Sequence, residues 1–409
     1  MLRRATPQHR SRRLTFARLT TVAILAITAT FATRSAQADE SENVLNLKYE
    51  FFRDRNRAWN HTPAFALRMA LSRAWRLGWE QEFDLVSGAS RRLGQGNVGQ
   101  SAGADAVTGA SKVETRFSES PSLTYSHAGT VASGSVYISR ERDYTSVSPA
   151  GSFAFDFNRR NTTVGGSYAE YFDAFRPTGA FKGMGGDKRI RSLGVEGAQI
   201  LTPLTLVGLT ANWIRSWGYL GHPYNPPIDR DGALMTEAVP DRKTAGALAA
   251  QIVQGYHLGN LLGSLNLDCR AYRDDWDLES GTVDLKVSQH FSESGYLRLR
   301  TRFYAQSGAA FAKDVYLGTE PFRTGDIRLY PFTSILVGAK ISAAFPEDWD
   351  DSVLLPDRWD LKFDYTIRDT RGDKLDSQPG EARSLRYQLY GPDEYYAQGV
   401  IMAGLTFNL

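Results

Sequence analysis

The feature that most constrains the fold of this chain is an alternation of apolar and polar residues with a period of two. Between residues 75 and 85 the odd positions are mostly large and apolar, whereas three of the five even positions are acidic. A period of two places the two sets on opposite faces of a β-strand. The same pattern recurs at residues 152–158, 358–368 and 401–409. The chain is therefore predicted to consist mainly of β-strands.

The composition supports an all-β fold. The chain has 37 Gly, 19 Tyr, 21 Phe and 8 Trp in 409 residues. Glycine suits the tight turns between many short strands, and aromatic residues favour strands and the interfacial girdles of membrane barrels. Long helices would need more of the residues with high helix propensity.

Sixteen segments satisfy the strand pattern, and they are bounded by turn residues. After residue 38 no apolar run reaches the roughly 20 residues that a helix needs to cross a bilayer, so a membrane-spanning form must be a barrel. The segments are 43–52, 64–71, 75–87, 112–127, 130–143, 150–158, 161–173, 188–201, 203–217, 243–257, 260–275, 278–290, 295–306, 329–345, 357–369 and 383–409. We predict a transmembrane antiparallel up-and-down β-barrel of about 16 strands.

The lengths of the connections distinguish a membrane barrel from a soluble β-sandwich, which also alternates. Tight turns fall near residues 72, 128, 160, 202, 259 and 293, and long connections span 88–111, 174–187, 218–242 and 307–328. Tight turns and long loops thus alternate along the chain. Two connections depart from this alternation: 273–277 is short for an outer loop, and 346–356 is long for a turn. Short turns on one rim and long loops on the other are typical of outer-membrane barrels with short periplasmic turns and long extracellular loops.

The first 38 residues have the parts of an export signal: a basic stretch, an apolar run from Leu19 to Phe31, and Ala36-Gln37-Ala38 before Asp39. We expect cleavage after Ala38, with an uncleaved anchor as the alternative, and hence a signal peptide over residues 1–38 and a bacterial outer-membrane barrel over residues 39–409. Seven of the 48 basic residues and none of the 45 acidic residues lie in residues 1–38. The remaining chain is slightly acidic, which gives no reason to expect nucleic acid as a partner.

The last segment indicates two further partners. Ile401, Ala403, Leu405, Phe407 and the C-terminal Leu409 alternate with Met402, Gly404, Thr406 and Asn408. This pattern is typical of the signal that the barrel-assembly machinery reads, although an aromatic residue usually stands at the end. We expect outer-membrane lipid and the assembly machinery as partners, and the sequence leaves the oligomeric state open.

An internal echo and several short motifs carry a resemblance to a known family. Residues 84–90 (DLVSGAS) return as residues 105–111 (DAVTGAS). Further motifs are residues 139–146 (SRERDYTS), 160–163 (RNTT), 218–224 (GYLGHPY), 272–276 (YRDDW) and 302–306 (RFYAQ). Together and in this order they resemble the domain of unknown function 3570 family, which spans nearly the whole mature chain. The resemblance implies an exported bacterial outer-membrane barrel and brings no established activity.

Charged residues in the predicted strands indicate where a lumen would lie. Arg298, Arg300 and Arg302 share one face of a strand, and arginines facing lipid would each cost about 2–4 kcal/mol at the midplane, so we expect them to face the lumen. An acidic counterpart on another strand is Glu80, Glu82 and Asp84. Two interpretations remain open: arginines facing acids across a constriction that selects solutes by charge, or a structural network of salt bridges.

No constellation predicts catalysis, a cofactor or a metal. The five histidines after residue 38 are scattered, and the single Cys269 can form no disulfide within the chain. Asp229-Arg230-Asp231-Gly232 begins like a calcium loop but lacks the later ligands, which favours a plain turn. We predict a pore or transporter for small hydrophilic solutes; the alternative is a plugged barrel that acts as a surface binding or structural protein, and a barrel enzyme ranks third.

Overall fold

The computed structural model describes residues 43–54, 59–87, 114–224, 226–313, 315–346, 355–369 and 395–409. The predicted signal peptide and its cleavage after Ala38 lie outside this part of the chain, as does the whole of the predicted loop 88–111. Among the described residues, no helix has the length and apolar character needed to cross a membrane.

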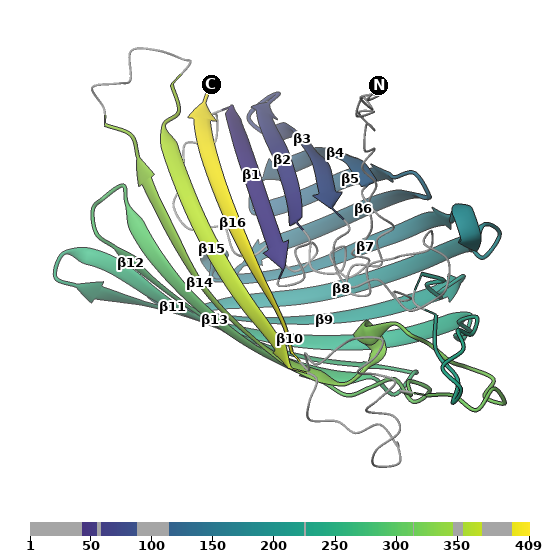
Figure 1. Ribbon diagram of the computed structural model, residues 1–409. Coiled ribbons are helices and arrows are strands. Elements are labelled where there is room, and N and C mark those ends of the chain that lie inside the picture. The colour runs from purple at the N-terminus through teal and green to yellow at the C-terminus, as the bar shows by residue number, and fades with distance from the viewer. Residues whose placement is uncertain are drawn as a thin grey trace, which may run out of the picture.

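The described strands form one closed barrel of sixteen strands, with β16 beside β1 (Figure 1). The strands are β1 (Val44–Asp54), β2 (Trp59–Ala70), β3 (Trp75–Ser87), β4 (Glu114–His127), β5 (Thr130–Arg140), β6 (Tyr144–Phe157), β7 (Thr162–Phe175), β8 (Gly186–Thr202), β9 (Thr205–Gly218), β10 (Arg242–Leu258), β11 (Leu261–Asp274), β12 (Glu279–His290), β13 (Tyr296–Gln306), β14 (Phe332–Ala344), β15 (Arg358–Asp369) and β16 (Tyr395–Asn408). Between the strands, the described residues form three short 3-10 helices: η2 (Asn158–Arg160), η3 (Gly179–Phe181) and η4 (Ile327–Leu329).

Every strand pairs antiparallel with its neighbours in sequence, and β1 closes the barrel by pairing with β16 from Val44↔Asn408 to Asp54↔Gln398. This confirms the predicted up-and-down barrel and its strand number. A closed sheet leaves no unpaired edge. A sheet that spans the hydrocarbon core of a membrane must be closed in this way, because no water is present there to bind unpaired N–H and C=O groups.

The turns that join the strands at the short-turn rim follow from their residues. Ala128 and Gly129 both have positive φ (48° and 79°), as a two-residue turn between twisted strands requires. Between β10 and β11, Gly259 alone has positive φ (60°), which matches a turn with glycine at its first central position. Hairpins of this kind hold the register of the strands they join.

Several strand boundaries differ from the prediction. β2 begins at Trp59 rather than 64, β6 begins at Tyr144 rather than 150, and β5 ends at Arg140 rather than 143. β16 begins at Tyr395, and the predicted extension from 383 to 394 lies outside the described residues. The predicted starts of β2 and β6, at residues 64 and 150, each directly follow a proline. Pro63 and Pro149 in fact lie inside strands, at positions where the ladder to one neighbour is interrupted.

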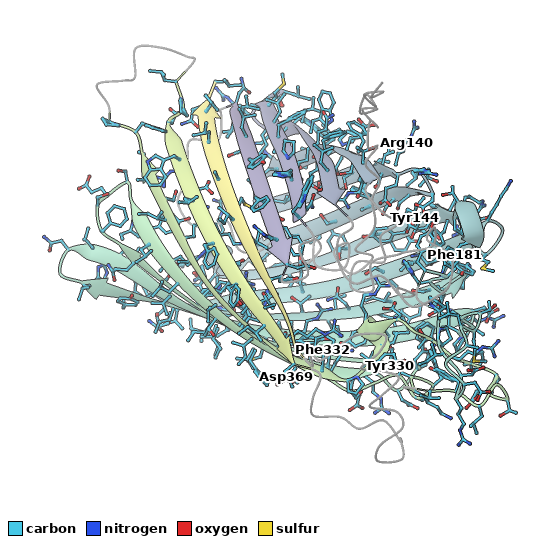
Figure 2. All side chains as sticks on the ribbon, viewed as in Figure 1. Arg140, Tyr144, Phe181, Tyr330, Phe332 and Asp369 are labelled. Atoms are coloured by element: carbon cyan, nitrogen blue, oxygen red, sulfur yellow. The ribbon has the colours of Figure 1, made fainter. Side chains whose placement is uncertain are left out.

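Two of the long connections also adopt ordered structure. Residues 219–241 and 307–331 contact each other through a bridge between Ala238 and Arg323. Arg140 and Tyr144, which border the β5–β6 connection, and Phe181 in the β7–β8 connection lie toward the same end of the barrel (Figure 2). The sequence Asp229-Arg230-Asp231-Gly232 forms a turn in which the Asp229 carboxylate accepts hydrogen bonds from the N–H groups of Asp231 and Ala233.

Candidate functional site: the charged lumen wall

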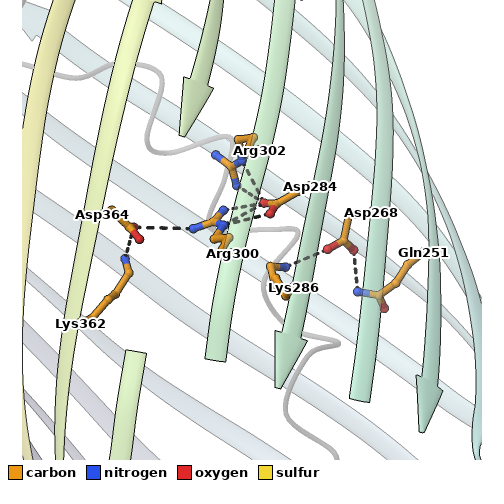
Figure 3. Close-up of polar contacts among 8 residues, drawn as sticks. All are labelled: Gln251, Asp268, Asp284, Lys286, Arg300, Arg302, Lys362 and Asp364. Carbon is orange, nitrogen blue, oxygen red and sulfur yellow. Dashed lines mark hydrogen bonds and ion pairs between the residues drawn. The ribbon is translucent and has the colours of Figure 1, made fainter. Parts of the chain in front are cut away.

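The two faces of β13 have different side chains and different environments. Leu297, Leu299 and Phe303 point outward with roughly half of their surface exposed, as expected for a surface that lipid would cover. Arg298, Arg300 and Arg302 occupy the alternate positions of the same strand and lie on the inner face. Figure 3 shows Arg300 and Arg302 among charged side chains of the neighbouring strands.

One buried carboxylate binds two of the three arginines. The Asp284 side chain is 4% exposed, and its Oδ2 accepts hydrogen bonds from the Nη2 atoms of Arg300 (2.6 Å) and Arg302 (2.7 Å). The Nε atoms of both guanidinium groups also donate to this carboxylate at 2.9 Å. Charge-assisted bonds of this geometry are the strong class of hydrogen bond. Asp284 therefore neutralises part of the charge of the arginine row from the adjacent strand.

A glycine lets Arg300 reach a second acid on a strand that is not its neighbour. Gly338 of β14 pairs with Arg300 on one side and with Asp364 of β15 on the other. A Cβ atom at position 338 would lie 2.1 Å from the Asp364 carboxylate. Without that Cβ atom, Arg300 Nη1 comes within 3.8 Å of Asp364 Oδ2, which also binds Lys362 Nζ at 2.7 Å.

The charged contacts continue along the wall on β10, β11 and β12. Lys286 Nζ binds Asp268 Oδ2 at 2.8 Å, and the Gln251 side-chain amide donates to Asp268 Oδ1 at 2.7 Å (Figure 3). We call the residues Gln251, Asp268, Asp284, Lys286, Arg300, Arg302, Lys362 and Asp364 the charged belt. It extends over strands β10–β15, with its positive and negative groups interleaved.

The predicted acidic counterpart lies in a separate group. On β3, Asp84 accepts a hydrogen bond from Arg116 Nε of β4 at 2.5 Å, and Glu82 lies 3.4 Å from the same guanidinium. Glu80 shares the inner face of β3 with them. The partners of Arg300 and Arg302 are instead Asp284 and Asp364, because these acids lie on adjacent and next-adjacent strands.

Arg298 differs from its two neighbours in the row. It pairs across the ladders with Ser288 of β12 and Lys340 of β14. Within the part of the chain that the structure describes, no ion pair to Arg298 is found, whereas Lys340 binds Asp360 at 3.3 Å. Arg298 is thus the member of the predicted row with the least compensated charge.

The inner faces of β4, β5 and β6, across the barrel from part of the charged belt, have hydroxyl groups, which the charge-based reasoning missed. Serines recur at every second position of β4, β5 and β6 on the face that carries Arg116 and Tyr137: Ser118, Ser120, Ser122, Ser126, Ser133, Ser135, Ser139, Ser146, Ser148 and Ser152. The signal was present in the sequence as serine at a spacing of two. A neutral hydroxyl arc therefore faces a lumen whose other side is charged.

The outer connections 219–241 and 307–331 enclose a buried polar cluster. Glu237 accepts hydrogen bonds from the His222 backbone N–H and the Thr324 hydroxyl, and Asp326 binds Arg328 Nη2 at 2.5 Å. Burial raises the pKa of Glu237 to about 8, with nearby Asp326 adding to the shift. The Arg328 guanidinium outweighs burial at Asp326 and lowers its pKa to about 2. The two connections thus form one ordered cap on part of the outer rim.

This cap is tied to the other outer connections. The Tyr224 hydroxyl donates to Asp143 in the β5–β6 connection at 2.5 Å, and Phe175 at the end of β7 packs against the Tyr224 ring. A cavity of about 360 Å³ lies beside Phe181, Met184, Tyr219, Leu234 and Glu237. Among the described residues, no group of three or more His, Cys, Asp or Glu side chains is arranged to hold a metal ion.

Comparison with protein families shows to which family the chain belongs. Residues 12–356 match the family described as protein of unknown function (DUF3570). The chain belongs to this family. The resemblance drawn from the echo at residues 84–90 and 105–111 and from the later motifs is therefore confirmed. A search of curated proteins gives no match.

Solved structures with a similar fold include an outer membrane secretin, a siderophore receptor and CdiB. A bacterial polysaccharide outer membrane secretin is 6% identical, with a TM-score of 0.48, 91% of this chain covered and 100% of that one. CdiB from Acinetobacter baumannii is 8% identical (TM-score 0.49; 91% and 61%), and the siderophore receptor PirA from Pseudomonas aeruginosa is 10% identical (TM-score 0.42; 82% and 57%). The chain spans between half and two thirds of the length of these last two proteins.

Proposed function

We propose that this protein is an outer-membrane pore or transporter for small hydrophilic solutes. The proposal includes export, removal of residues 1–38, and insertion by the barrel-assembly machinery. It assigns no catalytic step and no cofactor. Its first support is the fold: a closed barrel whose sixteen strands direct apolar side chains outward and polar side chains inward can carry water through its interior.

The observation that carries the proposal is how the inner wall satisfies its charges. Asp284, Asp364 and Asp268 are paired with cations that stand on the same wall, one or two strands away. If a plug were held in the lumen by electrostatic contacts, the charged residues of the wall would instead form ion pairs with residues of the plug. A self-paired charged belt opposite a hydroxyl arc offers hydrogen-bond donors and acceptors to a passing solute on both sides.

The second candidate function is a plugged barrel whose outer connections bind a partner at the cell surface. The ordered cap favours it, because the buried contacts of Glu237, Asp326 and Arg328 hold residues 219–241 and 307–331 in one arrangement next to a cavity of about 360 Å³. Rigid loops around a cavity are a common form of binding site.

Conductance separates the two candidates. Purified protein is inserted in planar lipid bilayers, and single-channel current and ion selectivity are measured. Arg298 is the informative position, because replacing it leaves the Asp284 pairs intact. Arg298→Gln and Arg298→Glu should shift selectivity progressively toward cations, with unchanged heat resistance. The matched control is Arg160→Gln, which removes a positive charge from the exposed β6–β7 turn and should not change selectivity.

The outcomes are distinct. A wild-type current above the protein-free bilayer, with a selectivity shift at position 298 and none at position 160, supports the pore. A wild type without current overturns it and favours the plugged barrel. A current whose ion selectivity is unchanged by Arg298→Glu would place the ion path away from the arginine row.

A further inference from the structure

The outer face of the barrel carries a group of arginines near the rim with the long connections. On β8, Arg189 and Arg191 alternate with the inward-facing Lys188 and Ser192, so they point outward. Arg191 pairs across the ladder with Arg215 of β9, and Trp217 lies between Arg189 and Arg242 of β10. We call Arg189, Arg191, Arg215 and Arg242 the outer basic surface.

Two of these guanidinium groups are held in place but remain open to the outside. Arg189 Nε and Arg191 Nε contact the same Glu170 oxygen at 2.6 and 2.9 Å. The Arg191 guanidinium lies 5.1 Å from the Trp217 ring centroid and that of Arg189 lies 4.6 Å from Phe172. The two arginine side chains are nevertheless 44% and 40% exposed. Cation–π contacts and one shared acid fix their positions while leaving donors free for an anion.

The surface holds more positive charge than its one acid can neutralise. Arg191 and Arg215 stand directly opposite each other, an arrangement that is unfavourable for like charges on neighbouring strands. In the described part of the chain, no ion pair to Arg215 or Arg242 is found. A bound anion between the strands would remove this repulsion, and arginine pairs bind phosphate oxygens in bidentate geometry.

An apolar surface adjoins these arginines along the same strands. Leu193 and Val195 on β8, and Leu209 and Trp213 on β9, point outward and are exposed. Beside them, a shallow groove of about 830 Å³ crosses β9–β13 and is lined in part by small residues: Ala211, Gly246, Ala271, Gly281 and Ala305. Positive charge next to an apolar, grooved surface is complementary to a lipid with an anionic headgroup.

We propose that the outer basic surface docks the phosphorylated headgroup of a lipid in the leaflet at the long-loop rim, with the acyl chains along the adjacent apolar face. The inference rests on the proposed membrane location, but it does not require an open lumen. Arg189 and Arg191 are preorganised by Glu170, Phe172 and Trp217, and Arg215 and Arg242 add the charge that is not compensated.

The test measures lipid binding to the full-length mature barrel in detergent micelles by native mass spectrometry. The probes are lipid A carrying both phosphates, the same lipid without phosphates, and inorganic phosphate. Arg191→Gln combined with Arg215→Gln should weaken binding of the phosphorylated lipid at least about tenfold, since each guanidinium–phosphate contact is a strong charge-assisted bond. The matched control is Arg140→Gln, which removes an outward, exposed arginine from the end of β5 (Figure 2).

Preferential binding of the phosphorylated lipid, lost in the double variant and retained in the Arg140→Gln control, supports the proposal. Equal binding of the dephosphorylated lipid overturns it, as does equal weakening in the control. Displacement of the lipid by inorganic phosphate at matched concentration would show a free-anion site instead and also overturn it. Conductance of the same double variant checks that it folds. Normal current together with lost lipid binding would show that lipid binding is independent of the pore. Lipid binding by a wild type that carries no current would refute the pore alone.

Discussion

Replacing Asp284 with asparagine should destabilise the barrel more than any other single change in the charged belt. The carboxylate is almost fully buried, and both of its partners are cations, so Asp284→Asn leaves Arg300 and Arg302 facing an amide. Breaking a buried pair by removing one partner costs about 3–5 kcal/mol. The arginine side chains are 19% and 30% exposed, and Arg300 keeps Asp364 at 3.8 Å, so screening reduces the expected loss to about 2–4 kcal/mol.

The control for this prediction is Asp268→Asn. Asp268 is itself 30% exposed, and its ionic partner Lys286 is 25% exposed, so a loss of about 0.5–1 kcal/mol is expected there. Both variants are unfolded with urea in detergent micelles, with tryptophan fluorescence as the signal. Combining Asp284→Asn with Arg302→Gln should cost less than the sum of the two single changes, because the unpaired cation is removed as well. Equal effects at positions 284 and 268 would refute the assignment of Asp284 as the centre of the belt.

Three further predictions test the cap, the strand phase and a turn. Because burial raises the pKa of Glu237 to about 8 from 4.5, the contribution of Glu237 to the stability of the cap should be fully present at about pH 4.5 and be lost as pH rises through 8; hydrogen exchange of residues 219–241 above pH 4.5 should show this slope, and Glu237→Gln should abolish it. Leu299→Arg should cost about 2–4 kcal/mol and impair assembly, whereas Arg298→Leu should still assemble; equal yields of heat-resistant barrel would refute the strand phase. Arg159 has positive φ (55°), so Arg159→Gly should leave urea stability equal or raise it by about 0.5–1 kcal/mol, and a clear loss would contradict the assigned strain.

Most of the fold could be predicted because a barrel repeats one simple rule. Alternation fixes which face each residue occupies, and hairpin turns fix where strands end. The failures at β2 and β6 come from a rule that works for open sheets, in which proline is restricted to edges and bulges. In this barrel Pro63 pairs with Tyr49 on one side, and the ladder to β3 skips it on the other. Pro149 is accommodated in the same way against β7.

The face of the arginine row could be predicted from alternation, but its partners require the register between strands. A hairpin pairs residues that are equally distant from its centre. The turn between β12 and β13 is centred on Glu293, so Asp284, nine residues before it, stands opposite Arg302, nine residues after it. The pairing of Asp284 with Arg302 could therefore be predicted from the sequence. The contact of Arg300 with Asp364 depends on the missing Cβ atom of Gly338, and alternation alone does not reveal it.

The distribution of arginines on the outer face links the two proposals to one orientation. In the described strands, the outward-facing arginines all lie toward the rim with the long connections: Arg53, Arg140, Arg189, Arg191, Arg215, Arg242 and Arg273. The outward positions next to the short turns are instead neutral, as at Trp75, Phe157 and Leu201. A barrel in a symmetric environment has no reason to separate its charges in this way. If the long-loop rim meets a leaflet rich in phosphate, this asymmetry orients the barrel and the outer basic surface anchors it, which leaves the inner wall for the proposed selection of solutes.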